Sequence, residues 1–343
     1  MARDKRIVSA LLGLGKAGEA VQLAQCGKPL TPAGQDLVPL AEAEWRATEA
    51  AIAELGYVRN DAARQLKLGR SSTVGAIVLD SGNPFYAQLV GGIEAAAEDS
   101  QLMVIAGSTG NREQRERLYL SLFEEQRVRG ILLASTGSSA ELIEAIRGRG
   151  TPVVMVESAQ AERGFSVSVD DIAGGEIAVQ HLAGLGRRRI GVVAARQDLR
   201  QVADRLTGAR RAAEAAGIEI EVLEAEDLTV LAGRTVGEAI VARSTAERPD
   251  AVFCVNDLLA VGVLQAFAFR HQIAVPEEIA LVGYDDIAFA RSTVVPLTSV
   301  SQPADLMGRT ALALLEEQIA DPGAPARHVS FTPTLVERES TTG

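Results

Sequence analysis

The sequence predicts an α/β protein whose core has two similar lobes, each built on a doubly wound parallel sheet. From residue 73 onward, apolar runs of strand length alternate with helical stretches whose apolar residues recur at a spacing of 3.6. Continuous apolar strands between helices are typical of parallel sheets that are covered on both faces. The alternation pauses near Asp170 and then resumes, so we expect two β/α series, one for each lobe.

The individual elements follow from the same pattern. We expect the first series to have strands at Thr73–Leu79, Leu102–Ala106, Gly130–Ala134 and Pro152–Val156, and helices at Phe85–Glu98, Arg112–Gln126 and Ala140–Arg147. In the second series, helices at Gly174–Leu185, Asp204–Ala216, Arg234–Arg243 and Leu258–His271 each lead to a strand, at Ile190–Ala194, Ile220–Leu223, Ala251–Val255 and Ile279–Val282.

The domain organisation places a small N-terminal segment before this core. We expect a small helical headpiece at residues 1–59 and a hinge at 60–72. The first lobe would comprise residues 73–169 and 303–329, and the second lobe residues 170–302 and 330–343.

Charge is unevenly distributed along the chain. The net charge of −11 argues against a nucleic-acid binder when the chain is taken as a whole. Residues 1–72, however, hold ten Lys and Arg against eight Asp and Glu, so the remainder carries all of the negative balance. An acidic core with a mildly basic N-terminal part fits a modular DNA-binding protein.

The remaining composition points to a reducing compartment. Cys26 and Cys254 have neither metal-ligand spacing nor a disulfide framework, and the three histidines are far apart in the sequence. No stretch approaches 18 apolar residues, and no cleavage site follows the apolar run Ile7–Leu14. We therefore expect a cytoplasmic protein with no metal, no cofactor and no membrane contact.

Small and polar residues follow several of the expected strands, for example at Asp80–Asn83, Ser135–Gly137, Asn256–Asp257 and Tyr284–Asp286. In open α/β sheets, ligands bind at the carboxyl ends of the strands. Two lobes that face each other along these edges would form a cleft for a small polar molecule. No nucleophile–base pair accompanies these residues, so the pattern indicates binding and not catalysis.

Five motifs in the right order resemble the LacI/GalR family of transcription repressors. They are Asp80-x-x-Asn83-Pro84-Phe85-Tyr86, Val169-Asp170-Asp171-x-x-Gly174-Gly175, Asp204-Arg205-Leu206-x-Gly208, Pro249–Gly262 and Val282-Gly283-Tyr284-Asp285-Asp286. The resemblance begins near residue 49 and covers about six-sevenths of the chain. It implies a core like that of the periplasmic binding proteins, a small-molecule effector, operator DNA and a homodimer.

By this resemblance, the effector contacts match Asn83, Phe85, Tyr86, Arg205, Asn256 and Asp285. Their chemistry agrees, because the aromatic rings offer a flat apolar surface and Arg205 carries a fork of donors suited to vicinal hydroxyls or a carboxylate. We therefore expect a sugar or a sugar acid. A simpler interpretation is open for some of them: Asn83 could form a turn and Asn256 a helix cap. Asp170 and Asp171 favour a structural role, as caps of the following helix.

The segment Asn60–Gly69 resembles the family's hinge helix, which lies in the DNA minor groove. Leu66 matches the residue that opens a base step, and insertion of an apolar wedge kinks DNA. By resemblance, the DNA-contacting hinge residues are Asn60, Ala63, Arg64, Leu66 and Lys67. The alternative is a solvated linker helix.

Residues 1–48 depart from the family pattern. Scattered glycines and prolines, among them Gly13, Gly27 and Pro29, leave no room for the two short helices of a helix-turn-helix. We hypothesise that the residues before about 48 are translated out of frame, because a shifted reading of Ala24–Pro29 can encode a family-like recognition helix. A gene with one uninterrupted frame and no such alternative would refute this.

Two other functions compete with a repressor. A solute-binding protein for transport shares the two-lobed architecture, but it would need an export signal and has no use for residues 49–70. The pattern Gly13-Leu14-Gly15-Lys16-Ala17-Gly18 is typical of dinucleotide binding and would make the chain an NAD-dependent enzyme. Pro29 and Pro32 interrupt the required helix and no second βαβ half follows, so we expect no enzymatic activity.

Overall fold

The computed structural model describes residues 71–158, 164–269 and 273–343. The headpiece, the hinge residues, the Gly13–Gly18 pattern and the frame hypothesis all lie outside these residues. The described residues belong to one compact unit, and this unit contains two six-stranded sheets. The predicted fold class is confirmed.

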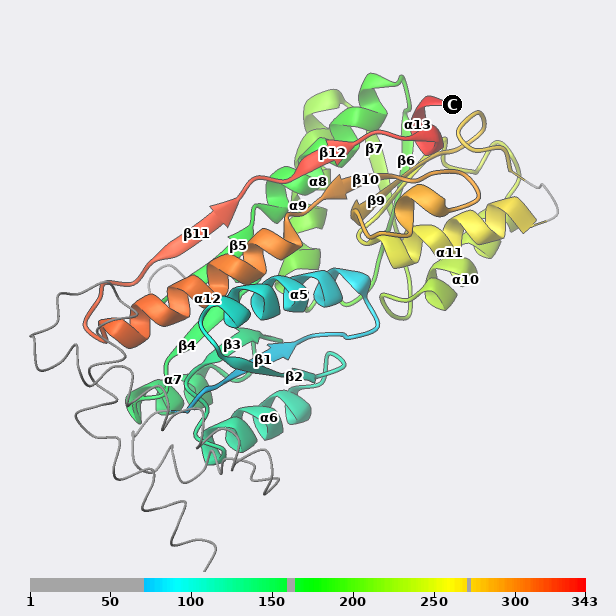
Figure 1. The fold of residues 1–343 in the computed structure, drawn as a ribbon. Helices are drawn as coiled ribbons and strands as arrows, with labels where there is room; N and C mark the ends of the chain where they lie inside the picture. Colours follow the sequence, from blue (N-terminus) through cyan, green and yellow to red (C-terminus); the bar gives the residue numbers. More distant parts are fainter. Residues whose placement is uncertain (1–70, 159–163, 270–272) are drawn as a thin grey trace, which may run out of the picture. The chain divides into compact units, whose positions relative to one another are not determined.

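The first sheet has the strand order β11-β5-β4-β3-β1-β2 and is parallel throughout. Its strands are β1 (Thr73–Val78), β2 (Met103–Ser108), β3 (Ile131–Ala134), β4 (Val153–Val156), β5 (Ser166–Val169) and β11 (His328–Phe331). Helices α5 (Pro84–Asp99) and α12 (Ala304–Ala320) pack together on one face, and α6 (Glu113–Glu125) and α7 (Ala140–Gly148) lie on the other (Figure 1). Strands β1, β3, β4 and β5 are buried throughout because both faces of the sheet are covered there, whereas the edge strands β2 and β11 are partly exposed.

The second sheet has the order β12-β10-β9-β8-β6-β7. Its strands are β6 (Arg189–Ala194), β7 (Glu219–Glu224), β8 (Ala251–Cys254), β9 (Ala280–Asp285), β10 (Thr298–Ser301) and β12 (Thr334–Val336). The helices are α8 (Asp171–Gly184), packed on α9 (Arg200–Ala216), α10 (Val230–Ala242), packed on α11 (Asp257–Ala268), and the short η2 (Ala290–Ser292) and α13 (Glu339–Thr342). The pair β10–β12 is antiparallel, so this sheet is not purely parallel as predicted.

The chain passes between the two sheets three times. It leaves the first sheet after β5, returns between β10 and α12, and crosses again between β11 and β12 (Figure 1). Strand β11 reaches Phe331, so the first lobe extends two residues beyond the predicted limit at 329, because His328–Phe331 pair in register with Ser166–Val169.

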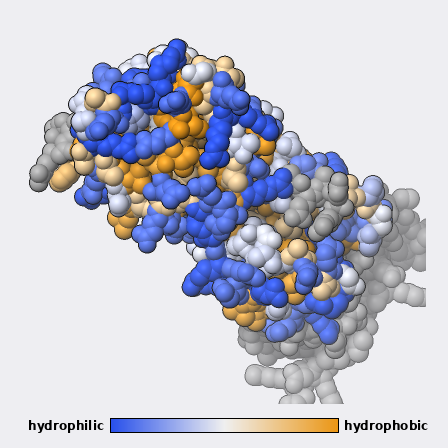
Figure 2. Space-filling view, turned by 180° about the vertical axis from the view of Figure 1, so that it is seen from behind, coloured by the Kyte–Doolittle hydropathy of each residue, from blue (hydrophilic) through white to orange (hydrophobic). Residues whose placement is uncertain are grey.

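The surface of the described residues is mixed. Viewed from behind, apolar side chains reach the surface in patches between polar ones (Figure 2). None of the helices in the described ranges is long and apolar enough to cross a membrane.

Candidate ligand-binding site

One pocket lies where the carboxyl ends of strands from both lobes face each other. About 420 Å³ of space lies among its lining residues, open solvent included. All six residues predicted to contact a ligand line it: Asn83, Phe85, Tyr86, Arg205, Asn256 and Asp285. The remaining lining residues are Asp80, Asn111, Glu157, Leu199, Gln201, Val202 and Leu228.

Asn83 and Asn256 each begin a helix and line the pocket at the same time. The Asn83 Oδ1 accepts a hydrogen bond of 3.0 Å from the backbone N–H of Phe85, at the start of α5. The Asn256 Oδ1 accepts one of 2.9 Å from Leu259 N–H, at the start of α11. Both side chains therefore satisfy backbone donors that a helix start leaves unpaired.

The aromatic wall consists of Phe85 and Tyr86 in the first turn of α5. Their ring centroids are 5.1 Å apart and the planes meet at 75°, an edge-to-face pair. Both rings are buried, and burial followed by the neighbouring carboxylate of Glu157 raises the pKa of Tyr86 well above its usual value. Tyr86 therefore remains a neutral hydroxyl in the working pH range.

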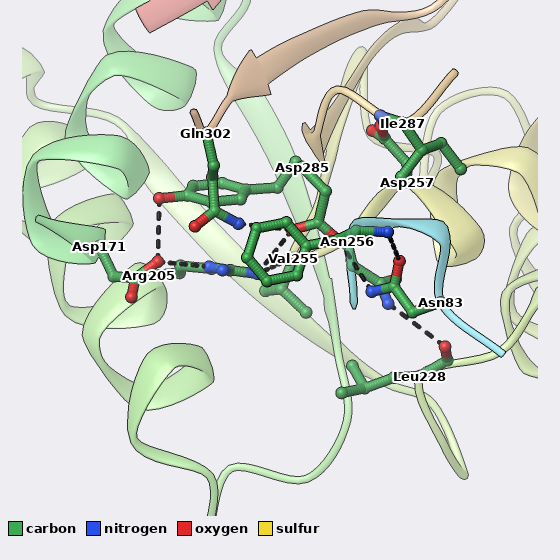
Figure 3. Close-up of polar contacts among 12 residues, drawn as sticks. Asn83, Asp171, Arg205, Leu228, Val255, Asn256, Asp257, Asp285, Ile287 and Gln302 are labelled. Carbon is green, nitrogen blue, oxygen red and sulfur yellow. Dashed lines mark hydrogen bonds and ion pairs between the residues drawn. The ribbon is translucent and has the colours of Figure 1, made fainter. Parts of the chain in front are cut away.

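Arg205 is fixed on α9 by partners from three elements (Figure 3). Its Nε donates to Asp171 Oδ1 over 2.8 Å, and its Nη1 donates to the carbonyl of Val255 over 2.8 Å. Nη1 also lies 3.5 Å from Asp285 Oδ1. Because the carboxylates outweigh the cost of burial, the pKa of Arg205 is raised above its ordinary value and the side chain stays charged.

Tyr284 completes the support of this arginine. Its ring lies under the guanidinium, 3.7 Å from Cζ to the ring centroid, and its hydroxyl donates to Asp171 Oδ1 over 3.0 Å. The expectation that Asp170 has a structural role is confirmed, because its carboxylate caps α8 through Ala173 N–H. Asp171 holds Arg205 and is not a cap.

Close helix packing places the Arg205–Asp171 pair. A Cβ atom on Gly208 would lie 1.9 Å from the carbonyl oxygen of Ile172, and one on Gly175 would lie 2.0 Å from the carbonyl oxygen of Arg205. Helices α8 and α9 can therefore touch only because glycine occupies both positions. This contact brings residues 34 positions apart within hydrogen-bond distance.

Asp285 joins the two lobes. The Asn83 Nδ2, from the first lobe, donates to Asp285 Oδ2 over 3.0 Å, and Gln302 Nε2, from the crossover after β10, donates to Asp285 Oδ1 over 2.8 Å (Figure 3). A second bond between the lobes runs from Arg196 Nη2 to the carbonyl of Asn111 over 3.2 Å. The lobes are therefore in direct polar contact beside the pocket.

Three of the lining residues hold an uncommon backbone conformation. The φ angle is +104° at Asp285, +56° at Glu157 and +56° at Asn111. Non-glycine residues rarely adopt positive φ, and such positions gather at binding sites where side chains must be aimed. Their concentration at one pocket supports a site shaped for a ligand.

Glu157, which follows β4, also lines the pocket and was not among the residues predicted from the sequence. Its Oε2 is buried and has no hydrogen-bond partner among the described residues. Burial raises the pKa of Glu157 to about 8, and the neighbouring Tyr86 and Arg205 only partly offset this effect. The position could have been found by the reasoning applied to Asn83, since it directly follows a predicted strand.

The described residues contain no group of three His, Cys, Asp or Glu side chains that could hold a metal ion. The pocket offers hydroxyl, amide, carboxyl and guanidinium groups beside two aromatic rings. This arrangement can bind and orient a small polar molecule.

Comparisons with known proteins agree with this geometry. Residues 179–341 match the family described as periplasmic binding protein-like domain. The chain is similar to the ribose operon repressor of Escherichia coli K12, with 34% identity over 307 residues, which cover 88% of this chain and 92% of the repressor. It is also similar in structure to the transcriptional regulator CelR in complex with cellobiose (TM-score 0.70, 29% identity, 95% of this chain and 98% of that one). A LacI family transcriptional regulator from Enterococcus faecalis V583 with bound ribose gives a TM-score of 0.71 at 27% identity, over 78% and 98% of the two chains.

Proposed function

Because this chain belongs to the LacI/GalR family of ligand-responsive transcription repressors, we propose that the pocket between its lobes is the effector site and that its effector is a sugar. A single observation carries the proposal: the six residues matched to effector contacts, which come from four separate parts of the sequence, all line one pocket. The family is not one of enzymes, so an NAD-dependent reaction is no longer a candidate.

The chemistry of the pocket suits a sugar. The rings of Phe85 and Tyr86 can pack against a flat apolar face of a pyranose or furanose, while Asn256 and Asp285 can contact its hydroxyls. Relatives with bound ribose and cellobiose support the same class of ligand.

We propose that the ligand acts through the contact between the lobes. Asn83 and Asp285 both line the pocket and bond to each other, so a ligand that touches either one changes the balance between joined and separated lobes. In a homodimer, this balance would set the spacing of the two hinge segments on operator DNA. The proposed DNA contacts are the hinge residues Asn60, Ala63, Arg64, Leu66 and Lys67, and we place the protein in the cytoplasm, where operator DNA lies.

A pair of variants tests the pocket. Leu228 lines it, whereas Leu231 begins the next helix and is 74% exposed. Leu228→Trp should fill the pocket and weaken sugar binding by at least about tenfold in calorimetry, and Leu231→Trp should leave the affinity within about twofold. Equal affinities for the two variants would show that sugars do not bind here.

DNA binding is tested with the full chain and its own upstream DNA by fluorescence anisotropy, with an unrelated duplex as control. A repressor binds the upstream duplex specifically and with an affinity that falls as salt rises. Addition of the sugar should change that affinity in the wild type and in Leu231→Trp, but not in Leu228→Trp. Equal, weak binding to both duplexes would refute operator recognition by this chain and direct attention to the reading frame of residues 1–48.

A further inference from the structure

The lining of the pocket is rich in acids and has a single cationic side chain. Its ionisable groups are Arg205 and the carboxyl groups of Asp80, Glu157 and Asp285, apart from the neutral Tyr86. Asp171 lies directly behind Arg205. Even with Glu157 uncharged, Asp171 and Asp285 outnumber Arg205, so the electrostatic environment of a ligand is negative.

Part of the donor capacity of Arg205 is already used by the protein. Nε is engaged by Asp171, and Nη1 is engaged by the carbonyl of Val255 with Asp285 beside it. Among the described residues, no hydrogen bond involves Nη2. One nitrogen of the guanidinium therefore remains for a molecule in the pocket.

This geometry decides which kind of group Arg205 can bind. Bidentate recognition of a carboxylate or phosphate needs two adjacent guanidinium nitrogens with parallel N–H bonds. At Arg205 every such pair includes a nitrogen that the protein already uses. A single hydroxyl or ring oxygen needs only one donor, and Nη2 can supply it.

Glu157, which lies in the first lobe, also favours a ligand hydroxyl over a carboxylate or phosphate. Its buried Oε2 has no partner among the described residues, and a buried polar atom without a partner costs stability until a ligand supplies one. A hydroxyl can accept from the protonated carboxyl or donate to the ionised one. A ligand carboxylate or phosphate in its place would meet a negative charge at high pH and would still face Asp285 at low pH.

We propose that the effector is an uncharged polyhydroxylated molecule, and that phosphorylated and carboxylated sugars are excluded by the charge of this pocket and by the engaged fork of Arg205. The inference rests on the proposed function, because it specifies the ligand class of that same site. It replaces the wider expectation of a sugar or a sugar acid.

The experiment measures matched pairs of ligands by calorimetry on the full chain at pH 7. The pairs are D-ribose with D-ribose 5-phosphate, D-glucose with D-glucose 6-phosphate, and D-galactose with D-galacturonate. In at least one pair the neutral sugar should bind, and its charged partner should bind at least about tenfold more weakly, since one unfavourable charge contact at low effective dielectric is enough for that factor.

A charge variant separates electrostatics from shape. Asp80 lines the pocket, and its Oδ1 accepts a hydrogen bond from Gly82 N–H, which an asparagine Oδ1 can also accept. Asp80→Asn should therefore reduce the ratio of the neutral sugar's affinity to that of its charged partner by about threefold. Asp321→Asn is the matched control, because exposed Asp321 makes the same type of turn with Gly323 away from the pocket.

The outcomes distinguish the inference from the proposed function. A charged sugar that binds as tightly as its neutral partner, or more tightly, overturns the inference and leaves the sugar site standing. Discrimination that is identical in Asp80→Asn and the wild type overturns the electrostatic explanation. If none of the six compounds binds, the sugar proposal itself fails and takes the inference with it.

Discussion

Glu157→Gln should make the thermal stability of the unliganded protein less dependent on pH. The Oε2 of Glu157 is buried without a partner among the described residues, and burial raises the pKa of this carboxyl to about 8. In the unfolded chain a glutamate titrates near pH 4.3, at about its ordinary pKa. Between these two values the folded protein holds a proton that the unfolded chain has lost.

The sign of the effect follows from this difference. Because the folded state binds more protons between the two pKa values, the free energy of unfolding falls as the pH rises through that window, and the loss is complete above the folded-state pKa. Each pH unit within the window is worth about 1.4 kcal/mol. From pH 5.5 to 7.5 the free energy of unfolding of the wild type should therefore fall by about 2 kcal/mol relative to that of Glu157→Gln. This is less than the full value for two pH units, because the Glu157 side chain is partly exposed.

The assay is thermal unfolding at constant ionic strength across that pH range. For a core of this size, 2 kcal/mol corresponds to a Tm difference of about 3–4 °C. The Tm of Glu157→Gln minus that of the wild type should thus increase by this amount between pH 5.5 and 7.5. The matched control is Glu98→Gln, an exposed position on α5. A Tm difference between Glu157→Gln and the wild type that stays constant across the range would refute the reasoning.

Three further predictions concern the support of the pocket. Arg205→Met leaves two buried carboxylates without their cation and should lower the free energy of unfolding by about 3–5 kcal/mol in urea titrations; a loss under about 1 kcal/mol would contradict this. Gly208→Ala places a Cβ against a carbonyl of α8 and should cost more than about 2 kcal/mol, whereas Gly184→Ala, with no atom within 4 Å, should not destabilise the protein. Asn83→Ala removes a helix cap and a bond between the lobes; it should cost about 1 kcal/mol and increase the radius of gyration of the unliganded protein in X-ray scattering, and an unchanged radius would show that this bond does not hold the lobes together.

The central strands could be predicted because they are apolar on both faces, and such runs are recognisable without tertiary information. Strand β5 was not predicted, since Ser166 and Ser168 interrupt its apolar residues, although both serines are buried. The serine hydroxyls face His328 on β11, at 2.9 Å and 3.3 Å from its ring nitrogens. Side chains that hydrogen-bond to each other across about 160 positions leave no local sequence pattern from which the strand could be predicted.

The site was predictable to the extent that topology determines it. Residues after parallel strands gather at one sheet edge, and this placed Asn83, Asn256 and Asp285 at the expected cleft, while the family resemblance assigned them as ligand contacts. The partners of Arg205 were not found, because the Asp171 contact depends on glycines that let two helices touch. The sequence therefore indicated a free fork of donors, whereas in the structure Nε and Nη1 of that fork already have protein partners.

Asn83 and Asn256 can be structural residues and ligand contacts at the same time. In a β/α unit the first residue of a helix directly follows the carboxyl end of a strand, which is also the edge where ligands bind. Asn83 uses its Oδ1 as a cap and keeps its Nδ2 for Asp285, so one side chain fixes the helix and reaches across the pocket. The cap holds the amide in one orientation, and the entropy cost of ordering that group is met on folding, before any ligand arrives. A capping asparagine at a strand end is thus better suited to bind a ligand than a free one, and the two roles support each other.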